Sequence, residues 1–173
     1  LSGAFGDKPD DVNAYAASSF YAVDRYASYK TDWGEFYREG GLVLSDRYTT
    51  SNAVHQCSKL PPMHWDGFLN WLFDFEYKKF GIPAPDAVIY LAVDPEISQK
   101  LITERYNGDE TKKDIQEKDT DYLARSRAAA EYCARTLGWH RIECTAQDAN
   151  GTKFMRSVED INAEILAELQ RIL

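Results

Sequence analysis

Cysteine is scarce in this 173-residue sequence, and long apolar runs are absent. The three cysteines, Cys57, Cys133 and Cys144, have neither the number nor the spacing of a disulfide framework or a zinc site. No apolar run approaches the roughly 20 residues that span a bilayer, and the first residues lack the basic start and apolar core of a secretory signal. We therefore expect reduced thiols, a cytoplasmic location and no membrane partner.

Cations are in the minority. The sequence has 20 Lys and Arg residues against 28 Asp and Glu residues, which gives a formal net charge of -8. Binding of a nucleic-acid duplex depends on clustered cations that neutralise phosphates, so no nucleic-acid duplex is expected as a partner. A mononucleotide needs only a few local arginines and stays possible. The length, and a hydrophobic content of 44%, fit a single domain over residues 1–173.

A glycine-rich phosphate-binding turn is also missing. Such a turn carries Lys and Ser or Thr at set spacing after a strand, and the nearest candidate, Gly3 to Lys8, has the wrong spacing. The three histidines form no metal-binding pattern. The sequence does not begin with Met, and we expect its start to be an interior cut of a longer protein, with strands missing upstream.

What is present is an alternation of amphipathic helices and short apolar strands. Helices are predicted from Asp10 or Asp11 to Gly40, and over about 63–80, 94–106, 117–137 and 157–172; strands are predicted over 42–46, 87–93 and 140–145. This alternation predicts an α/β fold, a three-layer parallel sheet with helices on both faces. Such sheets bind ligands at the carboxyl ends of their strands, which directs attention to the residues after 44 and 93.

The first candidate site follows the predicted strand 42–46. Arg47 at the strand tip can fork two N–H donors onto a phosphate, and Asp46 beside it can hold a hydrated magnesium ion. Ser51, Asn52 and His55 begin the next segment, where Asn52 and His55 share a face if the segment is helical. Asn52 could then pair with the edge of a base. The alternative is a structural Asp–Arg ion pair beside a polar cap.

Tyr21 and Arg25 form the second candidate. They are four residues apart and so stack on one face of the first helix, where a ring and a guanidinium could hold a base. The alternative is a surface tyrosine packed against an arginine stem.

The third candidate is a polar segment with Arg105, Lys112 and Lys113. These cations could close over a polyphosphate as a lid, over about 105–118. The alternative is a solvated charged loop.

Taken together and in this order, the segments resemble the thymidylate kinase family of P-loop nucleoside monophosphate kinases. The resemblance runs from Asn13 to Leu173. It depends on the aromatic-x-x-x-Arg helix at 20–25, the Asp-Arg-Tyr signature at 46–52, the Pro-Asp strand leading to Pro-Glu at 85–96, and the lid-like stretch at 105–118.

The resemblance implies a role for each position. Tyr21 would stack on thymine and Arg25 would bond its exocyclic oxygen, while Arg47 would grip the monophosphate. Ser51 and Asn52 would contact the substrate, and Asp46 would sit near Mg²⁺. The cations of the lid are Arg105, Lys112 and Lys113, and some of them would meet the phosphates. His55 departs from the family, which usually has Tyr or Phe beneath the sugar.

The family transfers the ATP γ-phosphate to dTMP, giving dTDP, with Mg²⁺ as cofactor, and its members are commonly homodimers. The glycine loop that positions ATP is not found in this sequence, so we expect the fragment alone to show negligible kinase activity. One alternative is an inactive nucleotide-binding module or remnant. Another is a kinase for a deoxynucleoside, which a phosphate-gripping Arg47 disfavours.

Overall fold

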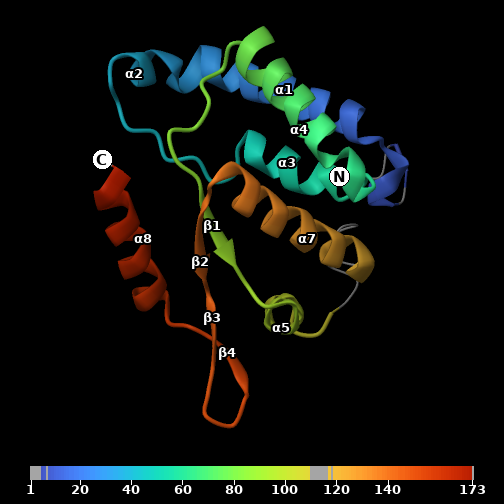
Figure 1. Ribbon diagram of the computed structural model, residues 1–173, viewed down its shortest axis with the longest axis vertical. Coiled ribbons are helices and arrows are strands. Elements are labelled where there is room, and N and C mark those ends of the chain that lie inside the picture. The colour runs from blue at the N-terminus through green and yellow to red at the C-terminus, as the bar shows by residue number, and fades with distance from the viewer. Residues whose placement is uncertain (1–4, 7, 110–116, 118, 173) are drawn as a thin grey trace. The chain divides into compact units, whose positions relative to one another are not determined.

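The computed structural model describes residues 5, 6, 8–109, 117 and 119–172 (Figure 1). Its residue contacts divide the chain into two compact units. The first comprises Leu1–Ala84 and Asp121–Ala130, and the second comprises Pro85–Thr120 and Glu131–Leu173. The expectation of a single domain over residues 1–173 stays a prediction.

The long first helix of the sequence prediction is present. It consists of α1 (Ala14–Ser28), a π-helical turn, η2 (Tyr29–Trp33), and α2 (Gly34–Arg38), which follow one another without a break. Gly40 then adopts a φ of +89°, a left-handed conformation that is open to glycine and ends the helix.

The start of this helix differs from the prediction. Asp10 and Asp11 belong to a short 3₁₀ turn, η1 (Pro9–Asp11), and the cap of α1 is Asn13. The Oδ1 atom of Asn13 accepts a hydrogen bond from the backbone N–H of Ala16 at 2.9 Å, which satisfies one of the otherwise unpaired N–H groups at the helix start.

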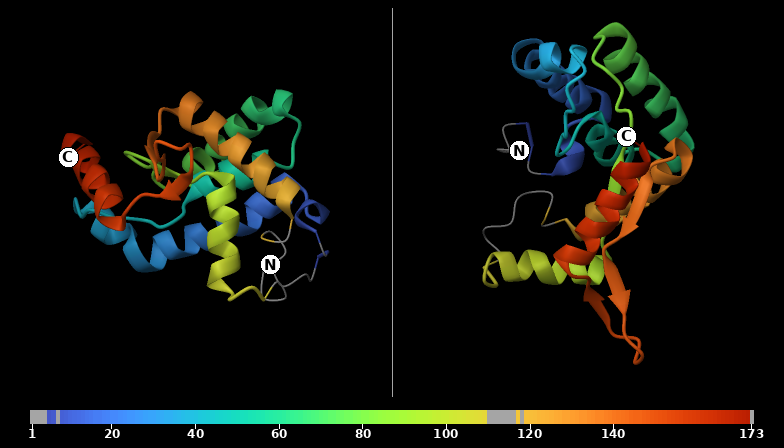
Figure 2. Two further views of the ribbon diagram at one scale, coloured as in Figure 1. Left: turned by 90° about the horizontal axis from the view of Figure 1, so that it is seen from below. Right: turned by 90° about the vertical axis from the view of Figure 1, so that its left-hand side faces the viewer.

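Helices dominate the first unit. After α3 (Thr49–Cys57) and a 3₁₀ turn, η3 (Pro62–His64), the chain forms α4 (Trp65–Phe73) and a π-helical turn, η4 (Asp74–Lys79). This confirms the predicted helix over 63–80. Helix α3 packs against both α1 and α4 (Figures 1 and 2). The core between these helices is apolar and includes Phe68, Leu69 and Leu72 of α4.

The predicted buried strand over 42–46 is wrong. No strand is assigned there; Leu42 is 68% exposed and Leu44 is 87% exposed. The strands among the described residues pair only as β1 with β2 and β3 with β4. An apolar run forms a strand only where a neighbouring strand completes its backbone hydrogen bonds, and no described strand pairs with residues 42–46.

The second unit contains the parallel pairing that the sequence predicts. Strand β1 (Ile89–Ala92) pairs with β2 (His140–Glu143), with Ile89 opposite His140 and Ala92 opposite Glu143. Helix α5 (Pro95–Arg105) follows β1, and the side chain of its cap, Asp94, accepts from the N–H of Glu96 at 2.9 Å. The strand and the start of the helix agree with the predicted ranges 87–93 and 94–106.

A β-hairpin that the sequence reading missed follows β2. Strands β3 (Thr145–Gln147) and β4 (Lys153–Met155) pair in an antiparallel manner, and the cap Ser157 opens α8 (Val158–Ile172) as predicted. Helix α8 lies beside β2 in Figures 1 and 2. The core of this unit is small, with Ile142, Cys144 and Ile161 at its centre.

Helix α7 (Thr120–Leu137) was predicted over 117–137. It contributes residues 121–130 to the first unit and 131–137 to the second, and Gly138 follows with a φ of +69°. Its inner face includes Tyr122, Ser126, Ala129 and Cys133, all of them buried.

The described residues thus show an α/β chain with one parallel strand pair and one hairpin. The larger three-layer parallel sheet stays a prediction. In the part of the chain that the structure describes, none of the helices has the length and apolar character needed to cross a membrane.

Candidate functional site

Glu76 is the centre of a buried polar cluster in the first unit. Its side chain has no exposed surface, and it lies in η4, one turn after Leu72 on the apolar face. Arg25 donates to it twice, from Nε at 2.7 Å and from Nη2 at 2.9 Å. Thr49 Oγ1 donates at 2.8 Å and Asn52 Nδ2 lies at 3.3 Å. Every contact is donated to Glu76, the pattern that an ionised carboxylate accepts.

Arg25 has N–H donors that Glu76 does not use. A guanidinium has five N–H groups, and Glu76 occupies the Nε–H and one of those on Nη2. The side chain is 17% exposed, and its central carbon lies 5.8 Å from the ring centroid of Tyr48. Arg25 therefore has a fixed fork on one side and, among the described residues, three uncommitted donors.

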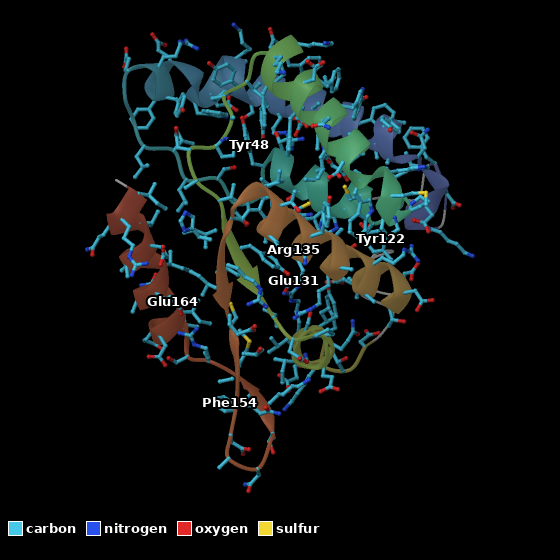
Figure 3. All side chains as sticks on the ribbon, viewed as in Figure 1. Tyr48, Tyr122, Glu131, Arg135, Phe154 and Glu164 are labelled. Carbon is cyan, nitrogen blue, oxygen red and sulfur yellow. The ribbon has the colours of Figure 1, made fainter. Side chains whose placement is uncertain are left out.

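Tyr48 closes this cluster from the other side. Its hydroxyl donates to the carbonyl oxygen of Pro83 at 2.8 Å, and its ring meets Trp33 edge to face at 6.2 Å between centroids. Burial raises the pKa of Tyr48 above its ordinary value of 10.0. Tyr48, which is labelled in Figure 3, is therefore a neutral, fixed ring beside Arg25 at physiological pH.

Asn52 is held on α3 by two acceptors. Its Nδ2 lies 3.3 Å from Glu76 Oε1 and 3.4 Å from the carbonyl oxygen of Ser18 on α1. Both neighbours accept hydrogen bonds, so the reversed amide would bring Oδ1 against two other oxygens. The amide orientation is thus determined by its surroundings.

Arg47 precedes α3 in an unusual backbone conformation. Its φ is +69°, the left-handed region that costs a non-glycine residue about 1–3 kcal/mol. The Nε–H donates to Ser51 Oγ at 3.2 Å, and Ser45 Oγ donates to the Arg47 carbonyl at 2.8 Å. The structure therefore brings Arg47 and Ser51 together, and leaves the guanidinium exposed.

His55 pairs with a residue that the sequence reading did not select. Its Nδ1 lies 3.0 Å from the hydroxyl of Tyr122 on α7, and the two rings are stacked at 6.1 Å between centroids. Tyr122, labelled in Figure 3, is fully buried, and burial raises its pKa to about 12. Tyr21 raises and Arg47 lowers the same pKa, so both lie within electrostatic reach of this hydroxyl.

Arg105, one of the lid candidates, lies in the second unit. Arg105 ends α5 and its Nη1 lies 3.4 Å from Glu117 Oε1, while the Tyr106 hydroxyl donates to Glu117 Oε2 at 2.9 Å. Lys112 and Lys113 lie outside the described residues.

Asp46 is an exposed carboxylate. The predicted alternative, an ion pair with Arg47, is not among the salt bridges that the described residues form. No group of three or more His, Cys, Asp and Glu side chains gathers to hold a metal in the part of the chain that the structure covers. A single carboxylate suits Mg²⁺ only where water and phosphates supply the other ligands, as they commonly do in phosphoryl-transfer enzymes.

Four members of these clusters were not among the predicted site residues: Tyr48, Thr49, Glu76 and Tyr122. A signal existed for Glu76, because it falls four residues after Leu72 on an otherwise apolar helix face, where an acid needs a buried partner. Tyr122 gave no such signal, since a tyrosine on an inner helix face most often only fills the core. The chain is therefore an α/β protein in which most of the predicted ligand-reading side chains gather in one helical unit.

Comparison with known proteins agrees with this class. The family model for thymidylate kinase matches residues 7–150. A thymidylate kinase of Mycobacterium tuberculosis is 30% identical over 141 residues, which cover 80% of this chain and 64% of that protein. A probable thymidylate kinase of Staphylothermus marinus is 34% identical over 88 residues, covering 51% of this chain and 40% of that protein.

The chain belongs to the thymidylate kinase family. Membership confirms the resemblance noted in the sequence and implies the α/β fold of P-loop nucleoside monophosphate kinases, a class of phosphoryl transferases. The chain spans just under two thirds of the length of the mycobacterial relative.

Proposed function

We propose that this chain is part of a kinase that transfers the γ-phosphoryl group of ATP to dTMP, giving dTDP and ADP, and that its first unit holds the acceptor. Family membership supports the reaction class. The observation that carries the acceptor assignment is the fork from Arg25 to Glu76, which leaves three N–H donors beside Tyr48 without a partner among the described residues. Such donors suit the exocyclic O4 of a thymine ring.

The proposed phosphate contact is Arg47. Its guanidinium is exposed, and its backbone is held in a conformation that costs energy. Strain of this kind persists where the surroundings or a function require it. Tyr21 would stack on the base, and Ser51, Asn52 and His55 would complete the acceptor site.

Mg²⁺ and ATP belong to the same proposal. Asp46 would contribute one oxygen ligand, directly or through water, and the metal would neutralise charge on the transferred phosphoryl group. Arg105, Lys112 and Lys113 would supply lid cations. In this scheme the described residues orient the acceptor phosphate. Positioning of this kind accounts for much of the catalysis of phosphoryl transfer.

A homodimer is proposed through the first long helix. Helices α1 and α2 expose large apolar side chains, each more than half exposed, and these are Phe20, Val23 and Phe36. Sedimentation velocity should report a dimer for the wild-type protein, and a Val23→Glu variant should sediment as a monomer.

A coupled ADP-release assay tests the reaction. The full-length gene product should turn over dTMP in preference to dUMP, dCMP and dGMP. Turnover with none of these would refute the kinase, and binding of dTMP without turnover would favour the alternative of an inactive nucleotide-binding module.

A further inference from the structure

Glu76 was not among the predicted site residues, yet it joins two of the proposed base-reading side chains. It accepts from Arg25 on α1 and from Asn52 on α3, and also from Thr49. We infer that Glu76 is a positioning residue that sets the base selectivity of the acceptor site, by fixing which atoms Arg25 and Asn52 present. This inference rests on the proposed function.

The first step concerns Arg25. With Nε–H and one Nη2–H committed to Glu76, the guanidinium plane is fixed and its remaining donors point away from the carboxylate. A fixed row of donors can bond only an acceptor on the base. Thymine and uracil have a carbonyl oxygen at position 4, whereas cytosine has an amino group there and would meet Arg25 donor to donor.

Asn52 supplies the second half of the pattern. Glu76 and the Ser18 carbonyl take its Nδ2, so the amide presents Oδ1 as an acceptor. Among the residues that the structure describes, none donates to this Oδ1. Thymine and uracil carry an N–H at position 3, while the N3 of cytosine is an acceptor. A donor from Arg25 beside an acceptor from Asn52 therefore matches thymine and uracil and mismatches cytosine.

The two halves depend on one carboxylate. A carboxylate offers acceptors only, so Arg25, Thr49 and Asn52 can all point donors at it without conflict. Replacing it by an amide introduces donors into the same space, and an amide N–H would face one of those three donors. Asn52 would then keep only the Ser18 carbonyl as an acceptor for Nδ2, and its reversed form, with Nδ2 outward, would suit the N3 acceptor of cytosine.

The test uses nucleotide binding by the purified chain. Isothermal titration calorimetry gives Kd values for dTMP, dUMP and dCMP with the wild-type chain and with Glu76→Gln. We expect dTMP and dUMP to bind more tightly than dCMP to the wild type. In Glu76→Gln the ratio of the dCMP Kd to the dTMP Kd should fall by roughly tenfold or more, because selectivity built on hydrogen bonds is lost when the partner orientation is free.

The matched control is Glu131→Gln in the second unit. Glu131 also accepts a two-pronged contact from an arginine, Arg141, at 2.9 and 3.1 Å. The Glu131→Gln substitution removes an ion pair of the same kind in the second unit, and the ratio of the dCMP Kd to the dTMP Kd should stay at the wild-type value. General weakening of the fold lowers the binding of all three nucleotides together and leaves the ratio unchanged, so the ratio separates positioning from stability.

The outcomes are distinct. An unchanged ratio in a Glu76→Gln chain that keeps its wild-type circular dichroism overturns the inference and leaves the proposed function standing. Equal binding of dTMP and dCMP by the wild type also overturns it. Binding of no nucleotide by the wild type ends the proposed acceptor site and the inference together.

Glu76→Asp decides the question should Glu76→Gln not fold. The variant keeps the charge but shortens the side chain by one methylene. The Asn52 contact is already the longest of the four, so it should be lost first. A fall in the same ratio supports the inference, and a ratio equal to that of the wild type overturns it.

Discussion

The Nε and Nη2 atoms of Arg25 lie 2.7 and 2.9 Å from the two carboxylate oxygens of Glu76, which stands 51 residues later in the chain. The contact ties α1 to the end of the α4 segment inside a helical core. It also gives the fully buried Glu76 carboxylate an oppositely charged partner. The same contact therefore contributes to the stability of the unit and to the geometry of the proposed acceptor site.

Removing one partner should be costly. We expect Glu76→Ala to lower the free energy of unfolding by about 3–5 kcal/mol, because Arg25 would keep a largely buried charge without a partner. Urea denaturation monitored by circular dichroism measures the change. The double variant Arg25→Met/Glu76→Met should recover part of the loss, since apolar side chains of similar volume often replace a buried pair at little cost. Recovery is partial because the buried donors of Thr49 and Asn52 still lack the Glu76 acceptor. A loss that stays as large in the double variant would contradict this account.

Substitution of Arg47 should separate stability from activity. Glycine adopts a φ of +69° without steric cost, so Arg47→Gly should keep or raise the free energy of unfolding, by about 1 kcal/mol. The same variant of the full-length protein should lose roughly 10²–10³-fold in turnover with dTMP, as should Arg47→Ala, because the phosphate loses its guanidinium. Denaturation and the coupled ADP-release assay give the two readouts.

Lys100→Gly is the control for this experiment. Lys100 is an exposed cation inside α5, where glycine costs about 1 kcal/mol relative to ordinary helix formers. This variant should be destabilised and should keep its turnover. Unchanged turnover in Arg47→Ala would remove the proposed phosphate role of Arg47.

Alkaline pH should destabilise the first unit through its buried phenols. Burial raises the pKa of Tyr122 to about 12 and that of Tyr77 to about 12, from an ordinary value of 10.0. The folded chain thus holds these protons more tightly than the unfolded chain. Their contribution is complete below pH 10 and is lost as the pH rises from 10 to about 12.

Tyr122→Phe isolates the contribution of Tyr122. The fall in unfolding free energy between pH 10 and 12 should become shallower, by up to about 3 kcal/mol, because phenylalanine does not ionise. Urea denaturation at a series of pH values measures this. The same slope in both proteins would show that Tyr122 is not held neutral by the fold. Near neutral pH, the lost hydrogen bond to His55 should cost about 1 kcal/mol.

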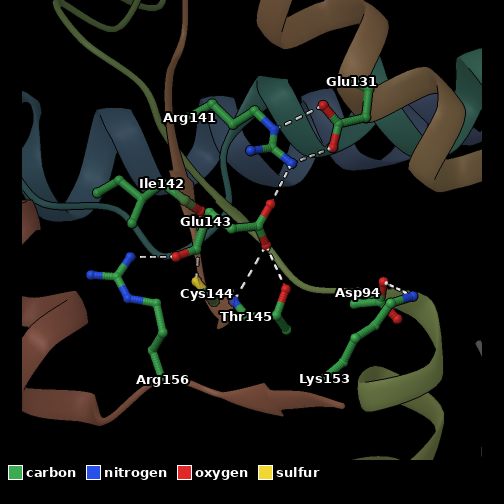
Figure 4. Close-up of polar contacts among 9 residues, drawn as sticks. All are labelled: Asp94, Glu131, Arg141, Ile142, Glu143, Cys144, Thr145, Lys153 and Arg156. Atoms are coloured by element: carbon green, nitrogen blue, oxygen red, sulfur yellow. Dashed lines mark hydrogen bonds and ion pairs between the residues drawn. The ribbon is translucent and has the colours of Figure 1, made fainter. Parts of the chain in front are cut away.

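Asp94 has two structural roles, a helix cap and an ion pair, and substitutions can separate them. Its side chain caps α5, and Lys153 on β4 lies 2.9 Å from its Oδ2 (Figure 4). Asp94→Asn keeps the cap and removes the charge, so it should cost under about 1 kcal/mol, as expected for an ion pair near the surface. Asp94→Ala removes both and should cost about 1 kcal/mol more. Thermal denaturation ranks the three proteins, and equal melting temperatures for the two variants would contradict the capping role.

Local pattern determined much of this protein. Apolar spacing identified the long first helix and α4, α5, α7 and α8, and the Asp94-Pro95 pair gave the start of α5 because its cap and its proline act within a few residues. The apolar run 87–93 predicted β1 (Ile89–Ala92). Four ordered motifs, at 20–25, 46–52, 85–96 and 105–118, predicted the family, and the family model confirms it.

Only the tertiary structure decided the rest. An apolar run such as 42–46 has the same local signal whether or not a partner strand completes its hydrogen bonds, so its exposure at Leu44 could not be read from the residues. Glu76 and Tyr122 acquire their contacts from segments 51 and 67 residues away. Burial and pairing of a polar group depend on which distant groups surround it, and that information resides in the packing rather than in any short stretch of the chain.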